Sequence, residues 1–304
     1  MTGITVLPED ASWAADAASA AGARLVPLGP LTEGLIWAGF HDVAGLRDAL
    51  AAAPHVRWVQ LPSAGVDDFM AAGLLSPGVV WTSAKGAFAR PVAEHALALT
   101  LATLRHLPER ARASTWGRPK GLSLFGARVL VVGAGGVATE LLRLLEPFEA
   151  HTVAVRRRTT PLPCAGRTTT ADHLLDELPQ ADVVVLAAAL TAGTRALVGA
   201  AELAAMKPDA VLVNVGRGAL VDTDALVDAL ARGSLAAAAV DVTEPEPLPD
   251  GHPLWSEPRA LVTPHTADTI EMIVPLLADR ITRNTRRFLA EEPLEGVVDP
   301  VAGY

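Results

Sequence analysis

Short apolar segments alternate with helical segments over most of the chain, and this alternation limits its fold more narrowly than any other feature. From residue 128 onward, strands separated by predicted helices are expected at 128–132, 152–155, 182–187, 210–214 and 237–242. Strands without a polar face must be covered by helices on both sides, as in a parallel sheet. We therefore predict a doubly wound α/β domain of the Rossmann type in this part of the chain.

A second, shorter series of the same kind comes first. Apolar runs at 4–7, 35–38, 56–61 and 79–82 alternate with helical stretches, and a long helix is predicted from Pro91 to Arg105. A chain of 304 residues, of which 50% are hydrophobic, is long enough for two domains with separate cores. The sequence therefore predicts two α/β domains.

The charge and the single cysteine argue against several classes of protein. The net charge of -9 provides no basic field that would recruit nucleic acid. The apolar runs are far shorter than the roughly 20 residues that span a bilayer, and the first residues do not resemble a signal peptide. Cys164 alone can form neither an internal disulfide nor a multi-cysteine metal site. We expect a cytoplasmic protein with no metal, no nucleic-acid partner and no membrane segment.

A glycine-rich turn follows the first predicted strand of the later series. Residues 128–138 read RVLVVGAGGVA, with the spacing G-x-G-x-x-A between strand and helix. The first glycine allows a tight turn, the second lets backbone amides approach a pyrophosphate, and the helix N-terminus adds partial positive charge. We predict a dinucleotide site that includes Gly133, Gly135, Gly136 and Val137. The alternative is a glycine-rich turn that only closes the fold.

Three consecutive arginines, Arg156, Arg157 and Arg158, follow the next predicted strand. In NAD-binding units a carboxylate at this place binds the ribose 2′-hydroxyl, but no Asp or Glu occurs here between Glu149 and Asp172. Arginine at this place favours the 2′-phosphate of NADP. We therefore prefer NADP as the cofactor, with NAD as the alternative. The competing interpretation of the arginines is a solvated loop.

Three later segments contain a set of motifs in a fixed order. They read VLVNVGRGALVDTDALVDAL (211–230), AVDVTEPEPLPDGHPLW (239–255) and LVTPHTA (261–267). In their order and spacing they resemble the D-isomer-specific 2-hydroxyacid dehydrogenases, a family that includes the glyoxylate/hydroxypyruvate reductases. LPSAGVDDF (61–69) and PVAEHALALTLATLR (91–105) are also similar to this family. The resemblance therefore covers nearly the whole chain.

The resemblance implies an oxidoreductase with two domains. Residues 1–95 and 287–304 would form a smaller flavodoxin-like substrate domain, into which a dinucleotide-binding domain of residues 96–286 is inserted. Members of the family transfer a hydride between NADPH or NADH and a small 2-oxo acid or D-2-hydroxy acid, here one of the glyoxylate/hydroxypyruvate type. They usually form homodimers through the cofactor domain. The alternative is a non-catalytic NAD(P)-sensing or corepressor-like protein on the same fold.

By the same resemblance, Arg217 binds the substrate, His265 donates or accepts the proton, and Glu246 is the acidic partner of the histidine. The side-chain chemistry agrees, because a guanidinium binds a carboxylate and polarises the adjacent ketone. An imidazolium can protonate the ketone oxygen, and a neighbouring carboxylate favours its charged form. Glu244 lies only two residues from Glu246, and the family's spacing from Asp241 selects Glu246.

Further contacts are implied by the resemblance. It assigns Val215 and Asp241 to the cofactor, with Asp241 accepting a hydrogen bond from the nicotinamide carboxamide. It also assigns the backbone amides of Ala64, Gly65 and Val66 to the substrate carboxylate.

The other candidate residues are Trp255, Asp268 and the remaining histidines. Trp255 either lines the substrate pocket or packs in the core. Asp268 is a carboxylate close to the catalytic motif where the family usually has a small residue, and we hypothesise that it disfavours doubly anionic substrates. We assign the remaining histidines, His95 among them, to structural or solvent-exposed positions.

Overall fold

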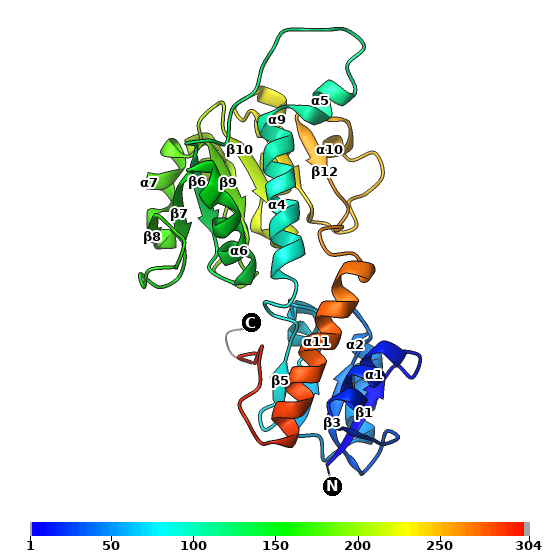
Figure 1. Ribbon diagram of the computed structural model, residues 1–304. Helices are drawn as coiled ribbons and strands as arrows, with labels where there is room; N and C mark the ends of the chain where they lie inside the picture. The colour runs from blue at the N-terminus through cyan, green and yellow to red at the C-terminus, as the bar shows by residue number, and fades with distance from the viewer. Residues whose placement is uncertain (1, 301–304) are drawn as a thin grey trace. The chain divides into compact units, whose positions relative to one another are not determined.

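The computed structural model describes residues 2–300, whose contacts divide the chain into two units (Figure 1). The first unit extends to Phe88 and resumes at Thr269. The second unit comprises Ala89–Asp268. Each unit is built on its own parallel sheet, as the two series of apolar segments predict.

The sheet of the first unit has the strand order β2-β1-β3-β4-β5, and neighbouring strands in it are parallel. This is the flavodoxin-like order. The elements of this unit are β1 (Gly3–Leu7), α1 (Ser12–Ala20), β2 (Arg24–Leu25), β3 (Thr32–Trp37), α2 (Val43–Ala52), β4 (Trp58–Gln60), α3 (Asp67–Ala71), β5 (Val80–Thr82) and α11 (Ile270–Leu289). Leu35, Trp37, Leu46 and Trp81 belong to its buried core.

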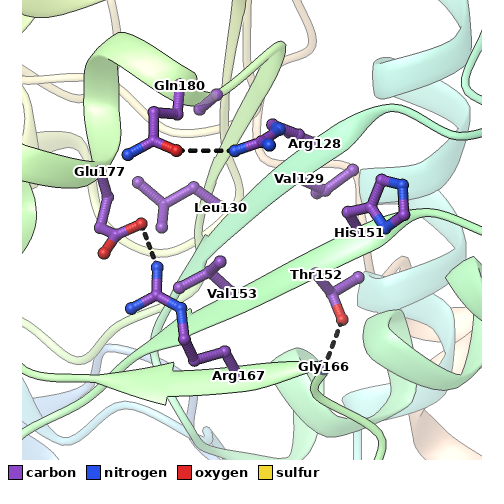
Figure 2. Close-up of a pocket in the computed structure, with 11 residues that line it drawn as sticks. Arg128, Val129, Leu130, His151, Thr152, Val153, Gly166, Arg167, Glu177 and Gln180 are labelled. Atoms are coloured by element: carbon purple, nitrogen blue, oxygen red, sulfur yellow. Dashed lines mark hydrogen bonds and ion pairs between the residues drawn. The ribbon is translucent and has the colours of Figure 1, made fainter.

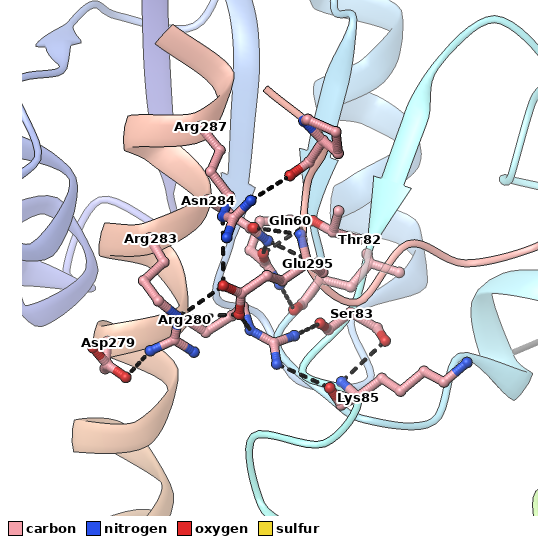
Figure 3. Close-up of polar contacts among 12 residues, drawn as sticks. Gln60, Thr82, Ser83, Lys85, Asp279, Arg280, Arg283, Asn284, Arg287 and Glu295 are labelled. Carbon is pink, nitrogen blue, oxygen red and sulfur yellow. Dashed lines mark hydrogen bonds and ion pairs between the residues drawn. The ribbon is translucent and has the colours of Figure 1, made fainter. Parts of the chain in front are cut away.

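Helix α11 is attached to this sheet through buried polar side chains (Figure 3). The amide nitrogen of Asn284 donates to Gln60 Oε1 (2.8 Å) and to the carbonyl of Glu295 (2.9 Å). The guanidinium of Arg280 donates to the carbonyl of Ser83 at 2.9 Å. Because Asn284 and Arg280 are both buried, these bonds fix the helix and the segment after it against β4 and β5.

The sheet of the second unit has the order β12-β11-β10-β9-β6-β7-β8, with every neighbouring pair parallel. Counted from β6, this is the Rossmann order 3-2-1-4-5-6 with one further strand at the edge. Its elements are α4 (Ala89–Leu104), α5 (Leu107–Ala111), β6 (Arg128–Val132), α6 (Gly136–Leu145), η1 (Glu146–Phe148), β7 (His151–Val155), β8 (Arg167–Thr169), η2 (Ala171–His173), α7 (Leu174–Glu177), η3 (Leu178–Gln180), β9 (Val183–Leu186), α8 (Ala200–Ala205), β10 (Val211–Asn214), η4 (Gly218–Leu220), α9 (Thr223–Arg232), β11 (Ala237–Val240), α10 (Pro253–Ser256) and β12 (Ala260–Val262). The predicted fold class is confirmed.

Both borders between the units differ from the division predicted at residues 95/96 and 286/287. Helix α11 packs along α1, so residues 269–286 group with the first unit. Helix α4 packs on α6, β10 and β11, so residues 89–95 group with the second unit. The borders lie where these packed helices begin, because a helix that buries one face against a sheet stays with that sheet.

The connectivity of the second unit gathers its motifs at one edge of the sheet. The glycine-rich turn follows β6, the arginines follow β7, and the segments with Arg217, Glu246 and His265 follow β10, β11 and β12. Since all these strands are parallel, their carboxyl ends lie at the same edge. The strand order reverses between β6 and β9, the position at which doubly wound sheets bind ligands.

Candidate active site

The glycine-rich turn joins β6 to α6 with a shape that only small residues permit. Gly133 has a φ of +133°, and a Cβ on it would lie 2.5 Å from the carbonyl oxygen of Ala187. A Cβ on Gly135, the N-cap of α6, would meet no atom within 4 Å, and no side chain caps the helix there. The first amides of a helix lack intrahelical partners and lie at its positive end. The turn therefore fits a pyrophosphate, which the backbone of Gly135, Gly136 and Val137 would bind.

The arginine run begins immediately after β7. The backbone N–H of Arg156 donates to the carbonyl of Thr169 (3.0 Å), and its Nη1 donates to the carbonyl of Thr160 (3.1 Å). Arg156 is partly exposed, and Arg157 and Arg158 are exposed. These contacts place Arg156 at the carboxyl end of β7, the second strand of this unit in chain order, where Rossmann units bind the adenosine ribose.

The loop that contains Arg217 follows β10 and is shaped by the buried Asn214. The Asn214 amide donates to the carbonyl of Arg217 (2.9 Å) and accepts from the N–H of Gly216 (3.1 Å). A Cβ on Gly218 would lie 1.9 Å from the carbonyl oxygen of Thr243, so only glycine allows this close approach. Asn214 is absent from our predicted site, although a polar residue at the end of an apolar strand is a signal for it.

The structure pairs His265 with Glu246. The Nδ1 atom of His265 lies 2.5 Å from Oε1 of Glu246, and both side chains are partly exposed. This hydrogen bond raises the pKa of His265 above its ordinary value, although burial acts in the opposite direction. The same bond lowers the pKa of Glu246, with a smaller contribution in the same direction from the charge of Arg217. Of the two glutamates Glu244 and Glu246, it is Glu246 that bonds to His265, while Glu244 is exposed.

This pairing determines what the imidazole can do. A charged histidine carries a proton on both ring nitrogens, and Nδ1–H is directed to Glu246. The proton on Nε2 is then the one that can be transferred to another molecule. Arg217 is close enough to lower the pKa of Glu246, so a guanidinium, a carboxylate and an imidazolium occupy one region. Such a set can bind an anionic substrate and protonate it.

Asp241 lies directly after β11 and is almost fully buried. Its Oδ1 accepts from the hydroxyl of Thr263 (2.6 Å) and from the N–H of Thr266 (3.0 Å). Its Oδ2 accepts from the N–H of Ala267 (3.2 Å), and His95 Nε2 lies 3.2 Å from Oδ1. Burial alone would raise the pKa of Asp241, but these hydrogen bonds outweigh burial and lower it. A bond from Asp241 to the nicotinamide carboxamide stays a prediction, as does the contact assigned to Val215.

The structure also locates the remaining predicted residues. Trp255 on α10 is 42% exposed and its Nε1–H donates to the carbonyl of Pro249 (3.0 Å), so it does not pack in the core. Asp268 is partly buried, and this burial raises the pKa of its carboxyl, while the charge of His265 opposes the effect. Residues 64–66 lie before α3 in the first unit, and their contact with substrate stays a prediction.

A pocket of about 380 Å³ lies at the opposite edge of the second sheet, at the amino ends of β6, β7 and β8 (Figure 2). Arg167 forms an ion pair with Glu177 there, and Arg128 donates to Gln180 Oε1 at 2.6 Å. None of the predicted site residues lines this pocket. It is therefore separate from the candidate active site.

Within residues 2–300, no helix is both long enough and apolar enough to cross a membrane. The same residues contain no group of three or more His, Cys, Asp or Glu side chains placed to share a metal ion.

Comparisons with known proteins identify the family of the chain. Residues 97–267 match the family described as D-isomer specific 2-hydroxyacid dehydrogenase, NAD binding domain. The chain is 41% identical over 256 residues to a Corynebacterium melassecola protein from the proB 3′ region, covering 82% of this chain and 84% of that protein. It is 33% identical over 228 residues to glyoxylate/hydroxypyruvate reductase B of Pectobacterium atrosepticum. This alignment covers 72% of this chain and 71% of that protein.

A solved structure shows the same fold over the whole chain. The D-isomer specific 2-hydroxyacid dehydrogenase of Xanthobacter autotrophicus Py2, in complex with NADPH and MES, aligns with a TM-score of 0.86 and 28% identity, covering 100% of this chain and 99% of that one. With a family match over more than half of the chain, this protein belongs to the D-isomer specific 2-hydroxyacid dehydrogenases.

Proposed function

We propose that this protein reduces a small 2-oxo acid of the glyoxylate/hydroxypyruvate type to the D-2-hydroxy acid, with NADPH as the hydride donor. The observation that supports this most directly is the pairing of His265 with Glu246, close to Arg217 and at the sheet edge that holds the glycine-rich turn. A related reductase of Pectobacterium atrosepticum is named for these two substrates.

In this proposal each side chain has one task. The guanidinium of Arg217 binds the substrate carboxylate and polarises the neighbouring ketone. Bound NADPH supplies the hydride to the carbonyl carbon. His265 donates the proton on Nε2 to the ketone oxygen, and the imidazole is left neutral. Glu246 holds the ring through Nδ1 and favours its charged form before transfer. In the direction of oxidation the neutral imidazole accepts the same proton.

The cofactor choice is based on the end of β7. Arg156 occupies the place where an NAD-binding unit has a carboxylate, and Arg157 and Arg158 follow it. The related structure from Xanthobacter autotrophicus contains NADPH. We therefore propose NADPH as the preferred cofactor and NADH as a weaker one.

We also propose that the protein is a cytoplasmic homodimer. The connection between α5 and β6, which extends from the second unit in Figure 1, exposes the apolar side chains of Trp116 (96%) and Phe125 (65%). In this proposal these exposed apolar side chains contact the partner copy, which would cover them. Light scattering tests the assembly, and a monomeric mass at micromolar concentration would contradict it.

Cell fractionation tests the proposed cytoplasmic location. We propose this location because Cys164 is the single cysteine of the sequence.

A panel of 2-oxo acids assayed with NADPH and NADH side by side tests the function. We expect turnover of glyoxylate or hydroxypyruvate, faster with NADPH than with NADH at equal concentration. Phenylpyruvate and 2-oxobutyrate serve as larger and apolar comparison substrates. Binding of NADPH without turnover of any 2-oxo acid would favour the non-catalytic, corepressor-like alternative.

Arg156→Asp tests the assignment of the 2′-phosphate. The substitution removes a charge-assisted hydrogen bond and places a carboxylate beside the phosphate, so kcat/KM with NADPH should fall by roughly 10- to 100-fold. The value with NADH should stay equal or rise, because a carboxylate can bind the ribose hydroxyl. Arg195→Asp, outside the arginine run, is the charge-matched control. An equal loss with both cofactors would refute the assignment.

Glu246→Gln tests the proton donor through pH. The bond to Glu246 raises the pKa of His265, and reduction requires the charged imidazole. Activity in this direction should therefore be lost as pH rises through that pKa. Removal of the carboxylate lowers the pKa, so the loss should occur at lower pH in Glu246→Gln. Glu244→Gln is the control, and kcat/KM of both variants is measured as a function of pH. Coincident profiles for Glu246→Gln and wild type would disprove the role.

Asp268→Ala tests substrate charge. The carboxylate of Asp268 interacts electrostatically with His265 and Arg217, and its negative charge should oppose a second substrate carboxylate. We expect the ratio of kcat/KM for oxaloacetate over glyoxylate to rise about tenfold in the variant. Asp250→Ala, at an exposed position, is the control. An unchanged ranking of these two substrates would show that Asp268 does not select against dianions.

A further inference from the structure

We infer that His95 is a positioning residue for the proposed reaction: it holds the carboxylate of Asp241, which in turn holds the segment that contains His265. The inference builds on the proposed function, but it concerns a helix that lies outside the three catalytic motifs. His95 is on α4, and 168 residues separate it in sequence from Thr263, its hydrogen-bond partner.

The contacts of His95 join helix α4 to the ends of two strands. Its Nε2 lies 3.0 Å from the hydroxyl of Thr263 and 3.2 Å from Oδ1 of Asp241. Asp241 follows β11 and Thr263 follows β12. The imidazole is mostly buried, with 22% of the side chain exposed, and the Asp241 side chain is 2% exposed. Water therefore competes little for these bonds, which strengthens them.

The donor in this cluster can be assigned from its hydrogen bonds. Thr263 has one hydroxyl proton, and this proton is donated to Oδ1 of Asp241 at 2.6 Å. The hydroxyl oxygen can then only accept from His95, and an ionised carboxylate is likewise only an acceptor. The Nε2 atom of His95 must therefore carry a proton, which it shares between Thr263 and Asp241. A side chain without a donor at this place would leave the buried carboxylate short of a partner.

Asp241, held by His95, is hydrogen bonded to the segment that contains His265. Its carboxylate accepts from the N–H groups of Thr266 and Ala267, the two residues after His265. Its backbone carbonyl accepts from the N–H of His265 itself at 2.8 Å. His265 has a φ of +51°, a left-handed conformation that is uncommon for residues other than glycine. Surrounding bonds must maintain such a conformation, and those to Asp241 act together with the bond from the N–H of His265 to the carbonyl of Thr263 (2.9 Å).

His95→Leu and His95→Gln test the inference. Leucine removes the donor, whereas glutamine places an amide N–H near the position of Nε2. With NADPH and glyoxylate, we expect kcat of His95→Leu to fall by about 10- to 100-fold, as for loss of a hydrogen bond to a charged group. His95→Gln should recover most of kcat. His173→Leu, which removes a histidine–aspartate pair at the surface, is the matched control and should retain wild-type kcat.

Hydrogen exchange provides a readout that needs no substrate. The amides of Thr266 and Ala267 should exchange at least about tenfold faster in His95→Leu than in wild type, and near the wild-type rate in His95→Gln. If the wild type reduces no 2-oxo acid, the proposed function fails while this readout still tests the support of the segment. Unchanged exchange in His95→Leu overturns the inference, as does a kcat of His95→Gln as low as that of His95→Leu. Should His95→Leu not fold, Thr263→Val replaces it with the same expected results.

Discussion

The site depends on one constraint of the parallel sheet: strands buried on both faces leave only their ends for polar chemistry. In β6, β9, β10 and β11 nearly every residue is buried, so the polar residues follow the strands. Asn214 ends β10 and Asp241 follows β11, and both are buried and hydrogen bonded. Because the strands are parallel and adjacent, these residues and the segments they hold lie at one edge.

Electrostatics then separates the roles of the two carboxylates that contact the His265 segment. Glu246 contacts the imidazole itself and favours its charged form, whereas Asp241 contacts backbone amides and fixes where the imidazole lies. The bond to Glu246 is partly exposed, so its strength depends on geometry and is reduced by the surrounding solvent. The bonds to Asp241 are buried and hold the backbone in place.

Sequence reasoning predicted the two sheets, because apolar strands are local signals, and the resemblance to the family implied the pairing partner of His265. The predicted borders differ by up to 18 residues at α11 from the borders of the two units in the structure, since which sheet a helix packs on is a tertiary property. Sequence reasoning also missed β2, β8 and β12, which are two or three residues long. The contact of His95 with Asp241 joins residues far apart in sequence, and no local pattern around His95 indicates it.

In the proposed mechanism, Glu246 keeps His265 charged so that the imidazole can donate a proton. The most direct test is an NMR titration of the histidine ring signals, with the His265 signal assigned by its absence in His265→Asn. The structure predicts a pKa for His265 above about 6.5, the usual value for histidine. A pKa at or below that value would show that Glu246 does not hold the proton on the ring, and would contradict the proposed mechanism.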